Sequence, residues 1–466
     1  MSGHSLVWFR NDLRIDDNPA LRAAVDRGQP LVAVYVLDED PAVARPHGGA
    51  SRWWLHHSLT ALDERLRSIG GRLILRSGSA PDVLAELIRE SDIEAVFWNR
   101  RYGKGERDQD AALKKAWREQ GLDVTSFAGS LLYEPWNVTK EDGEGYAVYS
   151  AYWRAAQASA HPRDVVATPR SLHDGSRGLA SDDLDDWGLL PSDPDWSGGL
   201  AETWAPGEET ALTRLHDFLS EGLHDYDAAR DRPGEDGTTR LSPHLRFGEI
   251  SPHRIWHEVH ESKVRGDSPD RLLSELGWRE FNYSLLYRHD HISERNIRPE
   301  FDDFPWKKPG RAQMRAWEQG RTGLPLVDAG MRQLWQTGWM HNRVRMVTAS
   351  FLIKNLLVDW REGEQWFWDT LVDADPANNA ANWQWVAGSG VDAAPFFRVF
   401  NPVTQSKKFD PDGAYIRRWV EELADIEAPA VHEPAGALDA DGYPAPMVDL
   451  KETRRAALDA FSTIKR

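Results

Sequence analysis

Two kinds of hydrophobic pattern divide this chain. In the first 130 residues, short apolar runs alternate with segments of helical periodicity, which predicts strands at 5–10, 31–37, 72–76, 94–99 and 123–127. The intervening segments predict helices at 19–25, 51–69, 81–90 and 109–120. Strands joined through helices form parallel sheets with right-handed crossovers. The pattern therefore predicts a doubly wound α/β domain, and the unbroken run LVAVYVL is typical of a strand buried on both faces.

The rest of the chain follows another pattern. From about residue 131 to 206, Asp, Ser, Gly and Pro dominate, as in a connector that lies over the surface. Beyond it, strand signals vanish and the periodicity predicts helices at 208–219, 251–261, 272–288, 326–337, 341–357 and 363–371. We therefore expect an α/β domain at 1–130, a connector at 131–206 and an all-helical domain at 207–466.

Composition narrows the class of protein. A chain of 466 residues favours two domains. No apolar run approaches the length of a membrane span, and the first residues lack the layout of a signal peptide, so we expect a cytoplasmic protein without membrane contact. The absence of cysteine excludes disulfides, thiolate metal sites and cysteine nucleophiles. No spacing of His, Asp and Glu resembles a zinc site, so we expect no metal.

Charge and tryptophan content leave questions open. A net charge of −18 argues against nucleic-acid binding when it is taken alone. The connector is strongly acidic, however, whereas residues 271–361 are richer in basic side chains. This distribution fits either a local basic face or two ordinary solvated surfaces. Core packing explains most of the 22 tryptophans, and only proximity to other motifs would identify electron carriers among them.

Two polar segments of the helical half carry candidate chemistry. GTTRLS at 237–242 offers hydroxyls and an arginine before a helix start, where a phosphate can bind, although a simple N-cap explains it as well. ELGWREF at 275–281 places Glu275, Trp278 and Arg279 on one helix face. That arrangement fits either an intrahelical ion pair beside a core tryptophan or part of a site.

A third polar segment runs from residue 338 to 401. Asn342, Arg345 and Met346 share a helix face, and a turn-forming stretch between apolar helices contains Asp373, Asp375, Asn378, Asn379 and Asn382. Because buried polar groups need partners, so many in one place indicate either a polar ligand or a dense capping network.

Taken together, these segments resemble the photolyase/cryptochrome family. WFRNDLRIDDNPAL, GTTRLSP, ELGWREF, GWMHNRVRM and the block from NWQW to DAAPFFRVFNP occur in the family's order over nearly the whole chain. The resemblance implies an α/β antenna domain, a long connector and a helical domain that binds FAD. It also implies light-driven repair of cyclobutane pyrimidine dimers, with UV-damaged DNA as the partner.

The resemblance assigns residues to FAD and to electron transfer. Those expected around FAD are Tyr226, Thr238, Thr239, Arg240, Leu241, Ser242, Arg279, Arg345, Asp373, Asp375 and Asn379. Asn379 matches the asparagine that faces flavin N5, where its carbonyl would favour the reduced flavin. Trp383, Trp360 and Trp306 match the family's electron-transfer chain, which restores the reduced cofactor.

The resemblance also implies a pocket for a flipped-out dimer. Its expected residues are Glu275, Trp278, Asn342, Met346 and Trp385. Beside this pocket, excited reduced FAD would donate the electron that opens the cyclobutane ring. The expected phosphate and sugar contacts are Arg230, Arg343, Arg398, Gln405 and Lys407.

Alternatives within the family are a (6-4) photolyase, a photolyase that prefers single strands, and a blue-light receptor. The (6-4) enzymes carry a histidine pair where this chain has Asn342 and Met346, and neither side chain can transfer a proton as imidazole does. Signalling cryptochromes extend well past the flavin domain, whereas this sequence stops soon after it. We therefore expect an enzyme that repairs pyrimidine dimers. The resemblance further implies a monomeric protein without an obligate protein partner.

The subclass and the antenna chromophore are less constrained. Leu272 stands where some relatives have tryptophan, and DADPANNAANWQW differs from the DGD-type stretch of some bacterial relatives, which fits another dimer-photolyase subclass. Glu106 aligns loosely with a glutamate that contacts folate, although a solvated surface carboxylate explains it equally. Methenyltetrahydrofolate is the first candidate and 8-hydroxy-5-deazaflavin the second, and an empty antenna site is the third possibility.

Overall fold

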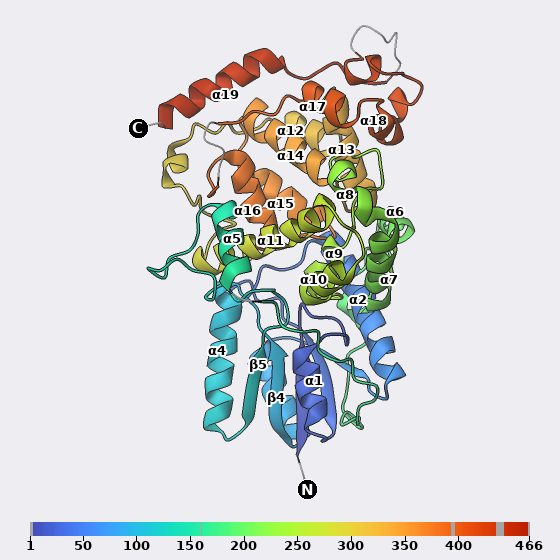
Figure 1. Cartoon of the computed structure of the whole chain (residues 1–466), viewed down its shortest axis with the longest axis vertical. Helices are drawn as coiled ribbons and strands as arrows, with labels where there is room; N and C mark the ends of the chain where they lie inside the picture. The colour runs from blue at the N-terminus through green and yellow to red at the C-terminus, as the bar shows by residue number, and fades with distance from the viewer. Residues whose placement is uncertain (1–2, 160, 393–396, 435–441, 465–466) are drawn as a thin grey trace.

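One parallel sheet forms the base of the N-terminal domain. The computed structural model describes residues 3–159, 161–392, 397–434 and 442–464. Five strands lie in the order β3-β2-β1-β4-β5, and every neighbouring pair is parallel. Their bounds are β1 His4–Phe9, β2 Leu31–Leu37, β3 Leu73–Ser77, β4 Ile93–Asn99 and β5 Asp123–Phe127. The predicted doubly wound α/β domain is confirmed, and it occupies the lower part of Figure 1.

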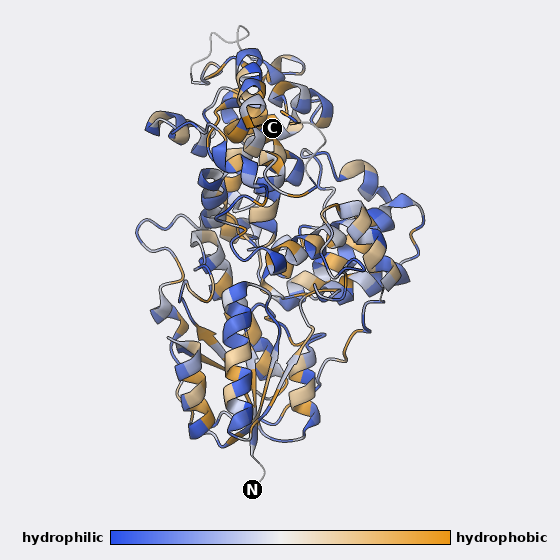
Figure 2. Ribbon diagram, turned by 90° about the vertical axis from the view of Figure 1, so that its left-hand side faces the viewer, coloured by the Kyte–Doolittle hydropathy of each residue, from blue (hydrophilic) through white to orange (hydrophobic). Residues whose placement is uncertain are grey.

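Helices cover both faces of this sheet. They are α1 Pro19–Asp26, α2 Gly49–Ser68, α3 Ala80–Glu90 and α4 Lys104–Glu119. Alternate residues of β2 enter different hydrophobic clusters, with Leu31 and Ala33 on one face and Val32 and Val34 on the other. The strand is thus buried on both faces, as its unbroken hydrophobicity predicts. In the side view, hydrophobic residues concentrate on the strands between the flanking helices (Figure 2).

The connector is more ordered than its composition predicts. It contains α5 Tyr149–Ser159, a 3-10 turn at Leu184–Trp187 and α6 Gly198–Thr203. Its backbone follows the α/β domain, where the Leu31 amide donates to the His173 carbonyl at 2.7 Å and the Asp182 amide to the Leu75 carbonyl at 2.8 Å. Helix α5 packs against α11, which is more than a hundred residues away in sequence. A short helix that depends on so distant a partner leaves little local signal.

The helical half occupies the upper part of Figure 1. Its α-helices are α7 Glu208–Asp217, α8 Tyr226–Ala229, α9 Ser242–Phe247, α10 Pro252–Glu261, α11 Asp267–Arg288, α12 Arg311–Glu318, α13 Pro325–Thr337, α14 Asn342–Ser350, α15 Trp360–Thr370, α16 Asn378–Ala387, α17 Pro402–Phe409, α18 Ala414–Trp419 and α19 Leu450–Ile464. Within the part of the chain that the structure describes, no helix is long and apolar enough to cross a bilayer.

Two local predictions in this half are wrong. The single helix expected at 341–357 ends at Ser350 and continues as a wider π-helical turn at Phe351–Asn355. The stretch expected to form turns through Asn382 becomes helical at Asn378, because Oδ1 of Asp375 accepts the Ala377 and Asn378 amides at 2.9 and 2.8 Å and so caps the start of α16. The polar residues at this point therefore start a helix in the middle of the domain.

Candidate functional site

Three helices that carry many of the expected site residues pack against helix α16. They are α11, α14 and α15, and α11 also packs against α8. Segments spread over more than 150 residues of sequence are therefore brought together. The loop between α15 and α16 adds Asp373 and Asp375, both buried.

Asp373 joins three of the predicted segments. Its carboxylate accepts the hydroxyl of Ser242 at 2.6 Å, and the two terminal nitrogens of Arg345 bind its two oxygens at 3.1 and 2.8 Å. The Nε of Arg345 donates in turn to the Met340 carbonyl at 2.7 Å. A two-pronged arginine–carboxylate pair fixes both side chains in direction as well as in distance. The three predicted residues Ser242, Arg345 and Asp373 therefore form one rigid unit.

Asp375 organises the other side of the same loop. The hydroxyl of Tyr283 donates to its Oδ2 at 2.7 Å, while Oδ1 caps α16. Arg279 lies with its guanidinium 4.8 Å from the centre of the Tyr283 ring and binds Glu280 at 3.1 Å. Neither Tyr283 nor Glu280 was predicted from the sequence. Both residues stand close to Arg279 on the same helix, α11, but neither their type nor their spacing indicated a role in the site.

Asn379 is fixed by a carboxylate from the neighbouring helix. Its Nδ2 donates to the carbonyl of Glu364 at 3.0 Å and to the Oε1 of the same residue at 2.8 Å. Arg45, from the α/β domain, binds both oxygens of Glu364 at 2.8 and 2.9 Å. Burial raises the pKa of Glu364, and the contacts with Arg45 and Asn379 oppose that rise. Because the amide nitrogen is engaged here, the carbonyl oxygen of Asn379 points to the other side.

The GTTRLS segment adopts a tight, partly buried turn. Oγ1 of Thr239 accepts the Leu241 amide at 3.3 Å, and Arg240 has a φ of 50° in the left-handed region. Arg240 lies 3.1 Å from Asp236, and its guanidinium is 5.3 Å from the ring centre of Trp339. Thr238 is partly buried, Leu241 is buried, and Tyr226 is buried with its ring perpendicular to that of Phe218.

The residues present fit FAD, by the chemistry of the donors and acceptors at the site. Arg246 donates through Nε to the Ala374 carbonyl at 2.6 Å, yet its Nη1 is buried without a partner among the described residues. Such an orphaned cationic donor suits an anionic group. Arg246 was missed as a site residue, although it follows GTTRLS closely in PHLRFGEISP. Cationic donors and buried carboxylates together match the phosphates and hydroxyls of a dinucleotide.

The three expected electron carriers belong to one apolar cluster. Trp383 and Trp360 are buried in it, and Trp306 packs against it from a partly exposed position. Trp360 donates through Nε1 to Asn296 at 2.8 Å. A Cβ on Gly363 would lie 2.2 Å from Cη2 of Trp383, so only glycine permits this approach of Trp383 to α15.

The expected pocket residues lie where the site meets solvent. Glu275, Trp278, Met346 and Trp385 are partly exposed and Asn342 is exposed. The ring of Trp278 stacks on that of Tyr149 from α5, with centres 3.8 Å apart at 13°, which is a contact that sequence reasoning missed.

The intrahelical ion pair considered for this helix is not formed. Glu275 binds Arg230 at 2.6 Å and Arg279 binds Glu280 instead. The polar groups that flank Trp278 therefore have separate partners, and only Glu275 belongs to the exposed edge.

The expected DNA contacts other than Arg230 lie on two helices and in the segment that precedes α17. Arg343, in the first turn of α14, binds Asp231 at 2.6 Å and stands 4.3 Å from the ring centre of Phe409. Gln405 and Lys407 are on α17, where Lys407 pairs with Glu433. Arg398 covers the Phe400 ring at 4.5 Å.

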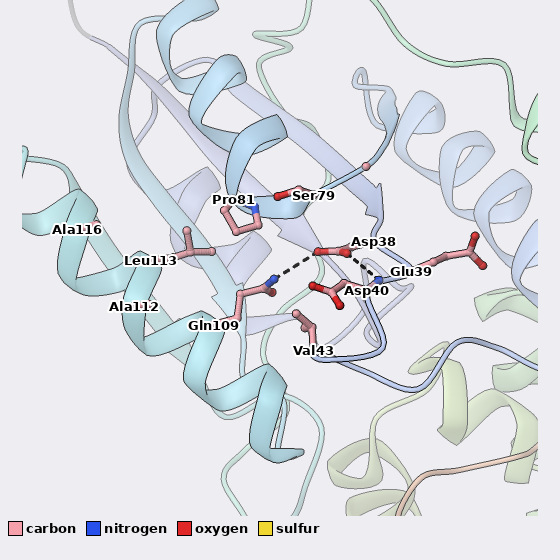
Figure 3. A pocket seen from close by; sticks show the side chains of 11 residues that line it. Asp38, Glu39, Asp40, Val43, Ser79, Pro81, Gln109, Ala112, Leu113 and Ala116 are labelled. Carbon is pink, nitrogen blue, oxygen red and sulfur yellow. Dashed lines mark hydrogen bonds between the residues drawn. The ribbon is translucent and has the colours of Figure 1, made fainter.

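Glu106 has a structural use in the α/β domain. Its carboxylate accepts the Gly103 amide at 3.0 Å at the start of its own helix, α4, and lies 3.6 Å from Arg101. A cavity of about 660 Å³ lies elsewhere in this domain, at the carboxyl ends of β2 and β3, and includes Asp38, Glu39, Asp40 and Gln109 in its lining (Figure 3). Asp38 accepts the Ala80 amide at 3.0 Å.

Comparisons with known proteins agree with this arrangement. A family model described as the FAD binding domain of DNA photolyase matches residues 272–463, and one described as DNA photolyase matches residues 5–170. A deoxyribodipyrimidine photo-lyase of Agrobacterium fabrum is 48% identical over 99% of this chain and 98% of its own. Cryptochrome-1 of Arabidopsis thaliana is 37% identical over 99% of this chain and 70% of its own.

A solved structure gives the same result in three dimensions. The crystal structure of a bacterial class III photolyase from Agrobacterium tumefaciens matches this fold with a TM-score of 0.95 at 47% identity, and the match covers 100% of this chain and 98% of that one. The chain therefore belongs to the photolyase/cryptochrome family and is an enzyme of the photolyase type.

Proposed function

We propose that this enzyme repairs cyclobutane pyrimidine dimers in DNA by light-driven electron transfer, as a photolyase of the class III kind. The observation that carries the proposal is the difference in exposure among the expected site residues. Asn342 is exposed and Glu275, Trp278, Met346 and Trp385 are half-buried, whereas the carboxylates Asp373 and Asp375 are buried. The five more exposed residues would form the outer edge of the site. Bound FAD would supply the absorption of light and the electron.

The residues of the outer edge have separable tasks. Trp278, stiffened by its stack on Tyr149, offers a flat wall for a flipped-out pyrimidine dimer, and Trp385 offers a second wall. Asn342 can hydrogen-bond the pyrimidine carbonyl and imide groups. Glu275 can accept a hydrogen bond from the imide N–H once Arg230 turns from it toward a DNA phosphate.

Inside the site, side chains of the protein would orient FAD and shield it from solvent. Arg246, Arg279 and Arg345 would bind the FAD phosphates and flavin oxygens, and Ser242 and Asp373 the polar chain between the rings. Asn379 would present its carbonyl to flavin N5. Trp383, Trp360 and Trp306 would carry electrons from the surface.

The (6-4) reaction is disfavoured by the role of the nearest histidine. His341 precedes Asn342 directly, but its Nδ1 accepts the Arg343 amide at 3.1 Å and so caps α14. Burial lowers the pKa of His341 to about 4. A neutral imidazole engaged as a cap is a poor proton donor, so it does not replace the histidine pair of (6-4) enzymes.

The test is photorepair of duplex and single-stranded oligonucleotides that carry one defined lesion, by reduced enzyme, in light and in the dark. We expect light-dependent repair of the thymine dimer alone, with a loss of at least tenfold in Asn342→Ala, as for the loss of hydrogen bonds to a reacting group. Bound FAD without repair of either lesion would contradict the proposal and favour a blue-light receptor. Repair of the single strand alone would indicate the single-strand variant.

An antenna chromophore belongs to the same proposal, with a folate as the first candidate and a deazaflavin as the second. The Asp38 cavity is acidic and suits a neutral ring more than an anionic tail. Trp335 offers an alternative place, where a chromophore could stack. Its side chain is 60% exposed, and its ring lies nearly parallel to that of Trp366 with ring centres 6.1 Å apart. The chromophore released on denaturing the purified protein identifies the ligand. Loss of its binding in Trp335→Ala, but not in Asp38→Asn or Glu106→Gln, would identify its place.

We propose domains at 1–130 and 207–466 joined by a connector at 131–206. We further propose that the protein is cytoplasmic and monomeric. Sedimentation of the FAD-bound protein with and without DNA measures the last point.

A further inference from the structure

Three of the cations expected to contact DNA are bound to carboxylates of the protein itself. The pairs are Arg230–Glu275, Arg343–Asp231 and Lys407–Glu433. The first pair joins two residues that both have expected tasks at the lesion. The carboxylates of the other two pairs, Asp231 and Glu433, have none.

The Arg343–Asp231 pair is the better defined of these two. The distance of 2.6 Å is that of a charge-assisted hydrogen bond, and Phe409 packs beneath the guanidinium with its ring centre 4.3 Å away. The side chain of Arg343 is 19% exposed and that of Asp231 is 36% exposed, so an incoming anion can reach the pair. Arg343 also follows Asn342 directly, which places the pair beside the expected lesion pocket.

A carboxylate and a phosphate oxygen bind guanidinium and ammonium groups in the same way. DNA phosphate therefore competes with Asp231 and Glu433 for the positive charge and the hydrogen-bond donors of Arg343 and Lys407. A cation already neutralised by the protein also releases fewer counterions from the DNA, which lowers the dependence of binding on salt.

We propose that Asp231 and Glu433 are internal competitors of DNA phosphate, which occupy Arg343 and Lys407 in the free protein and so restrain its affinity for DNA. This inference rests on the proposed function, because it takes DNA as the partner of these cations. Restrained affinity would let the enzyme leave undamaged DNA, where the pocket contributes nothing to binding.

The opposite role makes the opposite prediction. If Asp231 only holds Arg343 in the geometry that DNA needs, removing the carboxylate will weaken DNA binding. If Asp231 competes with phosphate, removing it will strengthen binding. The sign of the change therefore decides between the two roles.

The experiment measures binding of the FAD-bound protein to undamaged and dimer-containing duplexes by fluorescence anisotropy over a range of salt concentrations. The variants are Asp231→Asn, Glu433→Gln and the double variant. The control is Glu235→Gln, which removes the same charge from the same segment but frees Arg232, a cation outside the expected DNA contacts. Thermal unfolding verifies that each variant is folded.

We expect each single variant to bind undamaged duplex roughly fivefold more tightly at low salt, and the magnitude of its salt slope to rise by about 0.9, which is the value for one additional phosphate contact. The control should change affinity by less than about twofold. The gain should vanish at high salt, where charges are screened, as an unrelated structural change would not.

Weaker DNA binding by Asp231→Asn, or a gain in affinity no larger than that of Glu235→Gln, would overturn the inference. The proposed function would still hold in that case if the wild type repaired pyrimidine dimers. If the wild type bound neither duplex but the double variant did, the inference would stand. If none of the proteins bound DNA, the inference and the proposed function would both fail.

Discussion

Nδ2 of Asn379 lies 2.8 Å from Oε1 of Glu364, and this contact determines which way the asparagine amide faces. Glu364 can serve as acceptor because Arg45 keeps it paired in spite of its burial. The α/β domain thus contributes one cation to the centre of the helical domain. If the Asn379 carbonyl faces the flavin, its orientation depends on a residue more than 300 positions away in sequence.

Replacement of Glu364 should destabilise the reduced flavin. In Glu364→Leu the amide loses its acceptor and can turn over, so we expect air oxidation of reduced FAD to speed up about tenfold, as for the loss of one charge-assisted hydrogen bond. Arg45→Gln should act in the same direction and more weakly, because Glu364 then favours its neutral form. Stopped-flow absorbance measures the rate, and Glu362→Gln on the exposed side of α15 is the control. An unchanged rate in both variants would show that the orientation of Asn379 does not matter to the flavin.

Gly363→Ala should disturb Trp383. The added Cβ would lie 2.2 Å from the indole ring, so the ring or helix α15 must shift. We expect a loss of about 1–3 kcal/mol in the free energy of unfolding, as for overpacking in a core. Photoreduction of FAD should slow as well, because Trp383 is the expected first carrier. Denaturant titration and steady illumination with a thiol reductant measure the two effects, and a variant with wild-type values for both would contradict the close approach.

Trp360→Phe should separate photoreduction from repair. The indole is fully buried and donates to Asn296, so phenylalanine removes an oxidisable ring and one hydrogen bond while it leaves a smaller aromatic ring in the core. We expect photoreduction of oxidised FAD to fall at least tenfold. Repair by enzyme that has been reduced chemically should remain within about twofold of the wild type. Equal losses in both assays would show that Trp360 acts on folding or on the cofactor site instead.

Glu280 should give the folded protein a characteristic pH dependence. Burial raises its pKa to about 7, against the opposing contacts with Arg279 and the Tyr133 amide. Between the ordinary pKa of a glutamate and pH 7 the folded protein binds more protons at this site than the unfolded chain does. The contribution of Glu280 to stability is therefore largest at low pH and is lost as the pH rises through 7, by at most about 1.4 kcal/mol per pH unit.

The comparison of wild type with Glu280→Gln isolates that contribution, because the amide does not titrate. Urea unfolding at pH 5 and pH 8 should show a larger loss of stability in the wild type than in the variant. Parallel pH profiles for the two proteins would mean that Glu280 is ionised at both pH values, with Arg279 as a sufficient partner.

Much of the fold could be predicted because its signals are local. The strand at Leu31–Leu37 is apolar throughout, and Asn18 caps the helix that Pro19 opens, as both residue types favour. One miss depends on a distant partner and the other on a local cap that sequence reasoning did not recognise. Helix α5 is stabilised against α11, and α16 begins where Asp375 caps it rather than where its polarity suggests a turn.

For the site, the sequence by itself determined which chemistries are available. The absence of cysteine, the asparagine and methionine in place of histidines, and the order of the family motifs are properties of the chain, independent of its folding. Tertiary structure alone decided the pairings: Arg45 with Glu364, Tyr149 on Trp278, Arg230 with Glu275, and Asp231 with Arg343. The physical reason is that a charged or aromatic side chain can pair with many others of complementary type. Only packing between elements that are far apart in sequence brings one particular partner within contact distance.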